Sequence, residues 1–129
     1  MEAICLGLFM MSASFFGAAL EFPGSPLHKI LPNDFVRLCF MGAAMGVTAT
    51  LIIYSPMGKL SGAHMNPALT FSFVRLGKIK MQDAIYYSIF QCIGGIAGVT
   101  LMSLVIGGAL KDPHVNYVVT APGRLGVAL

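Results

Sequence analysis

The residues best suited to act on a ligand lie in a short segment near the middle of the chain, around Asn66 and Pro67. Asparagine is a preferred helix N-cap and proline fits the first helical turn, so we expect a short helix over residues 67–75. The run from Ser61 to Arg75 is apolar enough for a membrane but too short to cross one, which favours a re-entrant segment. The amide NH2 of Asn66 can donate a hydrogen bond to water or a hydroxyl oxygen without adding charge.

A helix that begins near the middle of a membrane presents unpaired N–H groups and the positive end of its dipole, which disfavours cations. Ahead of it, the non-helical backbone of Gly62, Ala63 and His64 would expose carbonyl acceptors. Such backbone is tolerated at membrane depth only where it is buried in protein or lines a wet cavity. This combination is typical of a path for neutral polar solutes. Asn-Pro also occurs in many turns of soluble proteins, so the inference of a solute path depends on the apolar sequence around it.

The composition places this segment in a membrane protein. The 129 residues are 57% hydrophobic and only 10% charged, with a mean hydropathy of +0.81, whereas a soluble domain carries roughly 25% charged residues. We predict an all-α integral membrane fold in which residues 1–110 form one unit. Its three transmembrane helices cover about 3–20, 36–54 and 84–110, and the re-entrant half-helix covers about 67–75.

Capping and small residues refine these elements. Asn33 offers an N-cap to the second helix and Asp83 one to the third, while the connection that begins at Glu21 is predicted to be an exposed loop. Close helix packing is expected from two glycine pairs with three residues between them, Gly42 with Gly46 and Gly94 with Gly98. The cysteines have no metal-ligand or redox spacing, and we interpret them as packing residues: Cys5, Cys39 and Cys92.

Orientation is predicted from lysine and arginine, which are enriched in short cytoplasmic loops. The segment 55–83 holds four such residues, and the flanking segments 21–37 and 111–129 hold two each. We therefore expect a multi-pass protein of the cell membrane with the middle segment and N-terminus in the cytoplasm and residues 111–129 outside it. No basic segment precedes the first apolar run, so it is interpreted as a retained helix rather than a cleaved signal. Its abrupt start suggests that a natural cytoplasmic end is missing.

Other classes of function are disfavoured. The net charge is +3, but the basic residues form no dense cluster for nucleic acid. No nucleophilic triad, carboxylate pair or phosphate-binding loop is present, so we expect no enzyme, cofactor or metal. The ring of His64 is interpreted as structural, and Gln91 as a brace for the re-entrant loop rather than a solute contact. The hydroxyl groups of the helices are expected to bond their own backbones: Ser12, Ser14, Thr48 and Thr50.

The run Ser61-Gly-Ala-His-Met-Asn-Pro-Ala-Leu-Thr70 closely resembles the signature of aquaporins and aquaglyceroporins, the major intrinsic proteins. Phe90-Gln-Cys-Ile-Gly-Gly95 resembles the family's third helix, and Asn116-Tyr-Val-Val-Thr-Ala-Pro-Gly123 resembles the extracellular loop of bacterial members. Essentially the whole chain is covered. The resemblance implies the first of two inverted repeats, each of three spanning helices and a half-helix, with residues 111–129 ending before the second repeat.

The resemblance also assigns roles by position. Asn66, Pro67 and Ala68 would form the first central motif, with pore-facing carbonyls from Gly62, Ala63 and His64. Met45 would contribute to the narrow constriction if a one-residue gap is allowed, and Gly46 takes that place without the gap. The family's helix-one glutamate aligns with Ile4 and not with Glu2, which argues against its usual hydrogen bonds to the loop.

We expect a passive channel for water or a small neutral solute such as glycerol, with the lipid bilayer as its surroundings. This chain would supply the first half-pore, and a missing second repeat or a second chain the rest. The family resemblance implies homo-oligomers, normally tetramers. The second central motif and its following arginine have no equivalent here, so the solute stays open, with water favoured. The alternative is a truncated or non-conducting membrane fragment or interaction subunit.

Overall fold

The computed structural model describes residues 1–119, which contain helices and no strand. Three helices are long and apolar enough to cross a membrane: α1 (Glu2–Glu21), α3 (Asp34–Tyr54) and α6 (Met81–Leu110). The shorter elements are α2 (Pro26–Ile30), α4 (Pro56–Ser61), α5 (Pro67–Arg75) and the 3-10 helix η1 (Asn116–Val118). The predicted all-α membrane fold is confirmed. The last ten residues of the predicted external loop, including Arg124, lie outside the described residues.

The long helices begin up to three residues earlier than the sequence pattern predicts. Asn33 caps α3 as expected, because its side chain accepts a hydrogen bond from Val36 N at 3.2 Å. The N-cap predicted for the third spanning helix is wrong: Lys80 is the N-cap of α6, and Asp83 lies inside the first turn. There its carboxylate interacts favourably with the positive end of the helix dipole.

Each of the three short α-helices begins with a capping side chain followed by proline. Ser25 precedes Pro26, and its Oγ accepts a hydrogen bond from Leu27 N at 3.3 Å. Ser55 precedes Pro56, and its Oγ accepts one from Gly58 N at 3.1 Å. Asn66 and Pro67 repeat the pattern at α5. A proline at this position loses nothing, since its missing N–H would have no helical partner. The connection predicted to be only an exposed loop therefore contains α2.

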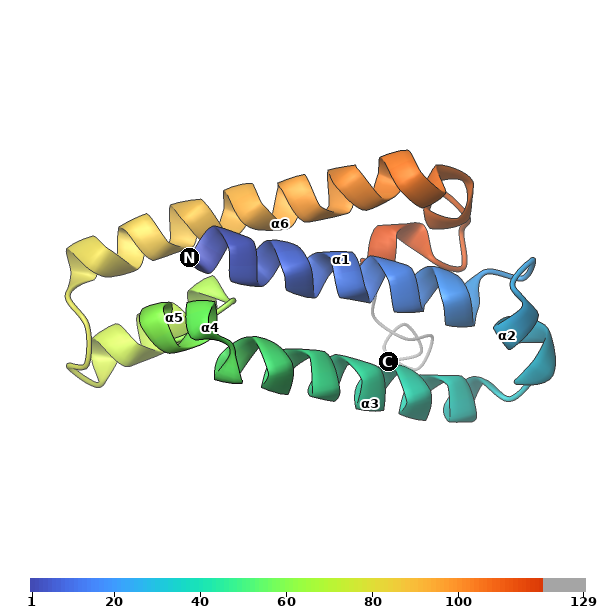
Figure 1. Ribbon diagram of the computed structural model, residues 1–129, viewed down its shortest axis with the longest axis horizontal. Helices are drawn as coiled ribbons and strands as arrows, with labels where there is room; N and C mark the ends of the chain where they lie inside the picture. Colours follow the sequence, from blue (N-terminus) through green and yellow to red (C-terminus); the bar gives the residue numbers. More distant parts are fainter. Residues whose placement is uncertain (120–129) are drawn as a thin grey trace, which may run out of the picture.

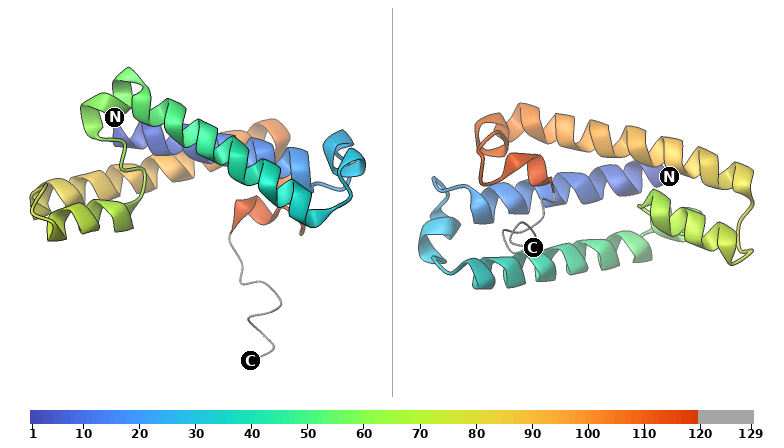
Figure 2. Two further views of the ribbon diagram at one scale, coloured as in Figure 1. Left: turned by 90° about the horizontal axis from the view of Figure 1, so that it is seen from below. Right: turned by 180° about the vertical axis from the view of Figure 1, so that it is seen from behind.

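Helix α1 is the centre of the bundle. It packs along α6 on one side and along α3 on the other, as Figure 1 shows. Helix α5 is confined to the end of the molecule where α6 begins, and it packs mainly on α6 (Figures 1 and 2). The short helix α2 closes the opposite end, between α1 and α3. The half-helix thus runs beside only part of the length of the spanning helices.

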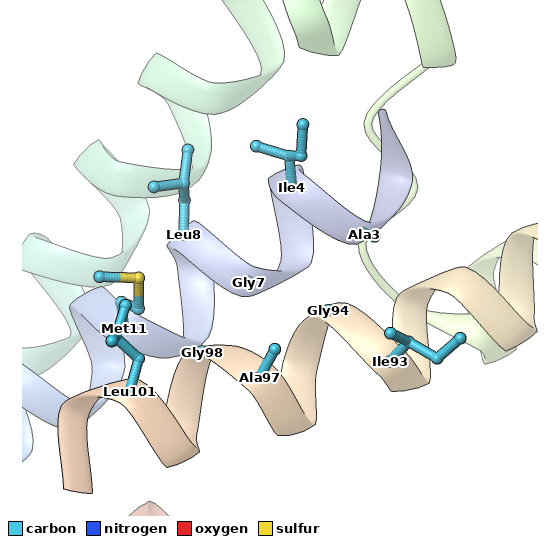
Figure 3. Close-up of a pocket in the computed structure, with 10 residues that line it drawn as sticks. All are labelled: Ala3, Ile4, Gly7, Leu8, Met11, Ile93, Gly94, Ala97, Gly98 and Leu101. Carbon is cyan, nitrogen blue, oxygen red and sulfur yellow. The ribbon is translucent and has the colours of Figure 1, made fainter. Parts of the chain in front are cut away.

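Glycines set the closest helix contact, between α1 and α6. A Cβ atom at Gly94 would overlap the carbonyl group of Ala3, and one at Gly98 would lie 2.5 Å from the carbonyl oxygen of Gly7. Figure 3 shows these glycines at the crossing, flanked by larger apolar side chains of both helices. The predicted close packing of Gly94 and Gly98 is confirmed. In contrast, a Cβ atom at Gly42 or Gly46 would meet no described atom within 4 Å, so this pair packs against nothing in residues 1–119.

Polar contacts join α1 to α3 at two levels. Ser12 Oγ and Thr48 Oγ1 lie 2.9 Å apart, so Ser12 bonds across helices, whereas Ser14, Thr48 and Thr50 bond their own backbones as expected. At the end of the bundle Arg37, only 6% exposed, donates to the carboxylates of Glu21 (3.2 Å) and Asp34 (2.6 Å) and to the Leu31 carbonyl oxygen (2.9 Å). This guanidinium ties the end of α1 to the start of α3.

A paired substitution tests the α1–α6 contact. Gly94→Ala should destabilise the chain by about 1–3 kcal/mol, since the added methyl group meets rigid backbone. Gly95→Ala is the matched control: its Cβ would lie 3.5 Å from Leu6 Cδ2, an ordinary contact. Alanine also has the higher helix propensity, so this variant should be neutral or slightly stabilised. Unfolding by denaturing detergent in mixed micelles measures both, and equal stabilities would contradict the assigned contact.

Candidate functional site

The backbone before α5 turns through left-handed conformations. Gly62, the C-cap of α4, has φ +89°, and Ala63 and Met65 have φ +46° and +47°. Glycine adopts such angles freely, but a residue with a side chain pays roughly 1–2 kcal/mol. Asn66 then returns to extended backbone at φ −159° and starts the helix. Two strained residues within four positions require strong contacts from the surrounding protein to hold the turn in place.

The carboxylate of Glu2 supplies those contacts. Oε1 accepts from His64 N at 3.1 Å, and Oε2 accepts from Met65 N at 3.0 Å and from Gln91 Nε2 at 2.7 Å. Glu2 is only 3% exposed, so these charge-assisted bonds form away from solvent. The expectation from alignment with Ile4 is wrong: Glu2 makes the bonds to the loop, while Ile4 is exposed on the outside of α1. One carboxylate thereby joins α1, the re-entrant loop and α6.

A second buried cluster lies beneath the loop and is centred on the Thr70 hydroxyl. This hydroxyl donates to the Asn66 carbonyl oxygen at 3.1 Å, and Gln91 Nε2 donates to it at 3.1 Å. His64 Nδ1 lies 3.2 Å from the same oxygen. The hydroxyl thereby connects the loop backbone, the His64 ring and α6. Gln91 therefore braces the loop, as predicted.

The His64 ring is packed within the protein. It stacks on Phe73, with ring centroids 4.7 Å apart, and lies 5.3 Å from the ring of Tyr87. This arrangement agrees with the structural role predicted for the ring. Thr70 was missed by sequence reasoning, although its place four residues after Asn66 was a usable signal, because a threonine hydroxyl commonly bonds the carbonyl oxygen four residues earlier.

The start of α5 combines an exposed amide with unpaired helix N–H groups. Asn66 Oδ1 accepts from Ala68 N at 2.8 Å, which caps the helix and orients the side chain. In the part of the chain that the structure describes, Asn66 Nδ2 has no hydrogen-bond partner, and the residue is exposed. The NH2 group and the positive end of the helix dipole therefore remain available to a neutral acceptor.

The other predicted site residues divide into two groups. Gly62, Ala63 and His64 lead through Met65 into Asn66, Pro67 and Ala68, so residues 62–68 form one continuous turn and helix start. Met45 lies midway along α3 and is half-buried. Since α3 packs chiefly on α1 and α4, no close packing joins Met45 to the half-helix.

The titratable groups outside this site are spread along the described part of the chain. Within residues 1–119, no three His, Cys, Asp or Glu side chains are arranged to hold a metal ion. Cys5 is buried, which agrees with the packing role predicted for it, whereas Cys39 and Cys92 are exposed on the helix surface, so that role is not seen for them within residues 1–119. Beyond α6, the backbone N–H and then the ring of His114 hold the pKa of the Asp112 carboxyl below its usual value. This contact stabilises a local turn.

Comparison with known proteins adds independent information. The family model described as "Major intrinsic protein" matches residues 2–125. The lens fiber major intrinsic protein of Bos taurus is 35% identical over 113 residues, which is 85% of this chain and 39% of that protein. Aquaporin-4 of Mus musculus is 34% identical over 91 residues (69% of this chain, 26% of that protein). Aquaporin Z of Brucella melitensis is 31% identical over 102 residues (76% and 44%).

The chain therefore spans less than half the length of these curated relatives. No solved structure gives a significant match to it.

The role of the Glu2 carboxylate can be tested by one substitution. Glu2→Gln replaces one carboxylate oxygen with an NH2 group. In the unsubstituted protein that oxygen accepts hydrogen bonds from backbone N–H groups or from Gln91, so at least one buried donor loses its partner. We expect a loss of about 1–3 kcal/mol in stability. Hydrogen exchange at the amides of His64 and Met65 should become faster.

Glu21→Gln is the matched control, because it makes the same change at the other end of α1 and leaves the loop contacts intact. Exchange at His64 and Met65 should then keep its original rate. Unchanged exchange in Glu2→Gln would show that the carboxylate does not hold the loop.

Proposed function

Because this chain belongs to the major intrinsic protein family, we propose that it supplies half of a passive transmembrane channel for water or small neutral solutes such as glycerol. The exposed start of α5 carries the proposal: a fixed, uncharged NH2 donor stands at the positive end of a helix. Such a site orients a neutral oxygen atom by hydrogen bonding and repels cations.

In this proposal the loop carbonyl groups of Gly62, Ala63 and His64 accept hydrogen bonds from solute molecules on their way to Asn66. Pro67 and Ala68 form the helix start, and Met45 on α3 contributes to the constriction. The bonds of Glu2 support this function, because they keep the strained turn in one conformation during passage of solute. We favour water as the solute.

A second half is needed for a closed pore. Asn66 and Ala68 are exposed in this chain, and an unpaired polar group facing hydrocarbon costs several kcal/mol. In the membrane, another polar surface must therefore face the start of α5. This requirement supports a half-pore role over a pore formed by one isolated copy.

The proposed setting is the cell membrane. We place the segment 55–83 in the cytoplasm, because it holds the largest group of basic residues, and residues 111–129 outside. By family resemblance, completed pores would assemble into tetramers. The alternative, a non-conducting fragment or interaction subunit, is favoured by one observation, the uncovered glycine pair Gly42 and Gly46 on α3.

Water permeability of proteoliposomes tests the proposal. Vesicles that contain the chain should shrink severalfold faster than empty vesicles under an osmotic gradient in stopped-flow light scattering, with a glycerol gradient as a second solute. Asn66→Asp retains an N-cap oxygen but places a negative charge at the helix start, so the excess permeability should be lost. Asn33→Asp is the matched control, since it makes the same change at the N-cap of α3.

The two variants should differ only in permeability. An excess rate that survives Asn66→Asp would place the path elsewhere in the protein. Shrinkage of the unsubstituted chain at the rate of empty vesicles would favour the non-conducting alternative.

A further inference from the structure

The two ends of the molecule differ in charge. The end at which α6 begins carries four basic side chains and two acidic ones, whereas the opposite end carries three of each within residues 1–119. The first end has Lys59, Arg75, Lys78 and Lys80 with Glu2 and Asp83, and the opposite end has Lys29, Arg37 and Lys111 with Glu21, Asp34 and Asp112. In the described part of the chain, the excess of positive charge therefore lies at one end.

Ion pairing increases this difference. At the opposite end the buried Arg37 is paired with two carboxylates. At the end where α6 begins, none of the ion pairs of residues 1–119 includes Arg75, Lys78 or Lys80, and all three side chains are exposed. Asp83 is the one exposed carboxylate at this end in the described chain. Three cationic groups close together in sequence are thus available to an anion.

The backbone that carries these groups is a tight, well-bonded turn, residues 75–80, which we call the basic turn. After Arg75, the last residue of α5, Gly77 N donates to the Val74 carbonyl oxygen and Lys78 N to the Phe73 carbonyl oxygen, each at 2.9 Å. This pair of bonds is the Schellman motif, common at helix C-termini, and Gly77 adopts its left-handed φ of +67° without strain. The turn therefore holds its cationic residues together without using their side chains.

Exposed tyrosines indicate the depth of the basic turn in the membrane. Tyrosine is enriched at membrane–water interfaces. Tyr54, the last residue of α3, is 70% exposed, and Tyr86, in the second turn of α6, is 64% exposed. Lys80 precedes Tyr86 by about 9 Å along the helix. The connection between α5 and α6 also forms the far end of the molecule in every view (Figures 1 and 2). The basic turn therefore lies at the level of the lipid headgroups.

Apolar side chains alternate with the basic ones. Leu76 is 68% exposed and Met81 is 53% exposed, on either side of Lys78 and Lys80. At a bilayer surface such apolar groups enter the acyl boundary while lysine ammonium groups extend to the phosphates. A nucleic acid or a soluble acidic protein would leave these apolar groups in water. The excess of positive charge further favours a headgroup with a net negative charge over a zwitterionic one.

We propose that the basic turn binds the headgroups of acidic phospholipids, with Lys78 and Lys80 on the phosphate group. The site is separate from the proposed solute path, because it uses side chains outside residues 62–68. Since Arg75 is the last residue of α5, a bound headgroup also restrains the outer end of the half-helix.

Quenching of a single tryptophan by brominated lipids tests the site. The sequence has no tryptophan, so Leu76→Trp reports the lipid beside the basic turn. Ile30→Trp is the control, because Ile30 is 71% exposed and follows Lys29 at the opposite end. The chain is reconstituted in vesicles that contain brominated phosphatidylglycerol or brominated phosphatidylcholine. We expect phosphatidylglycerol to be preferred about fivefold or more at Leu76→Trp, and no preference at Ile30→Trp.

Two outcomes of this measurement would overturn the inference. Equal quenching of Leu76→Trp by the two lipids would mean that no acidic lipid is selected there. The same preference at Ile30→Trp would mean that acidic lipid is attracted to the whole chain and not to the basic turn.

Charge variants in the Leu76→Trp background identify the groups that bind. Lys78→Gln with Lys80→Gln should bring the preference close to one, whereas Lys78→Arg with Lys80→Arg should retain it. Lys29→Gln with Lys111→Gln is the matched control, since it removes the same charge from the opposite end and should change nothing. A preference that survives the first pair, or is lost in the arginine pair, contradicts the assignment.

Inorganic phosphate distinguishes a lipid headgroup from a free anion. Phosphate and chloride are added at equal ionic strength, so that charge screening is the same. Quenching of Leu76→Trp by brominated phosphatidylglycerol should be equal in the two salts. Its selective loss in phosphate would show that the basic turn takes the free anion and would overturn the assignment to lipid.

Discussion

A buried carboxylate on the first turn of α1 determines whether the re-entrant loop has one shape. Two residues of the loop, Ala63 and Met65, hold left-handed angles that an isolated peptide would avoid. The N–H groups of His64 and Met65 converge on Glu2, and the third bond, from Gln91, connects the same carboxylate to α6. These three hydrogen bonds to Glu2 form a junction that fixes the position of the start of α5. Without it, the loop carbonyl groups and the Asn66 amide would have no fixed relation to one another.

This junction in turn requires α1 and α6 to lie very close together. Gln91 is on the same helix as Gly94 and Gly98, at which the backbones of the two helices touch, and no larger residue fits at Gly94. In lipid such contact has little hydrophobic driving force, so close packing and internal hydrogen bonds stabilise the pair. The glycines of α6 therefore serve the site indirectly: they bring Gln91 within hydrogen-bond distance of Glu2.

Local signals in the sequence predicted most of the fold. The apolar runs gave the three spanning helices within a few residues, and the cap followed by proline at Asn66 and Pro67 predicted α5. The same signal stands at Ser25 and Ser55, where α2 and α4 begin. The site was predictable only in part. The path residues around Asn66 are contiguous and can be recognised in the sequence, whereas the bonds of Glu2 and Arg37 depend on tertiary contacts. The alignment with the family placed the helix-one glutamate at Ile4 and not at Glu2, because a shift of two positions on a helix cannot be judged without the packing partner.

The contacts of Glu2 also impose an order on biosynthesis. Its partners His64 and Met65 follow it by 62 and 63 residues, and Gln91 follows it by 89. Glu2 is synthesised before all three partners, so its carboxylate has none of these contacts while α3 and the loop are made. Contacts between residues so distant in sequence form late, because the intervening chain must first be arranged. The full set of Glu2 contacts is consequently complete only after Gln91 on α6 has been made.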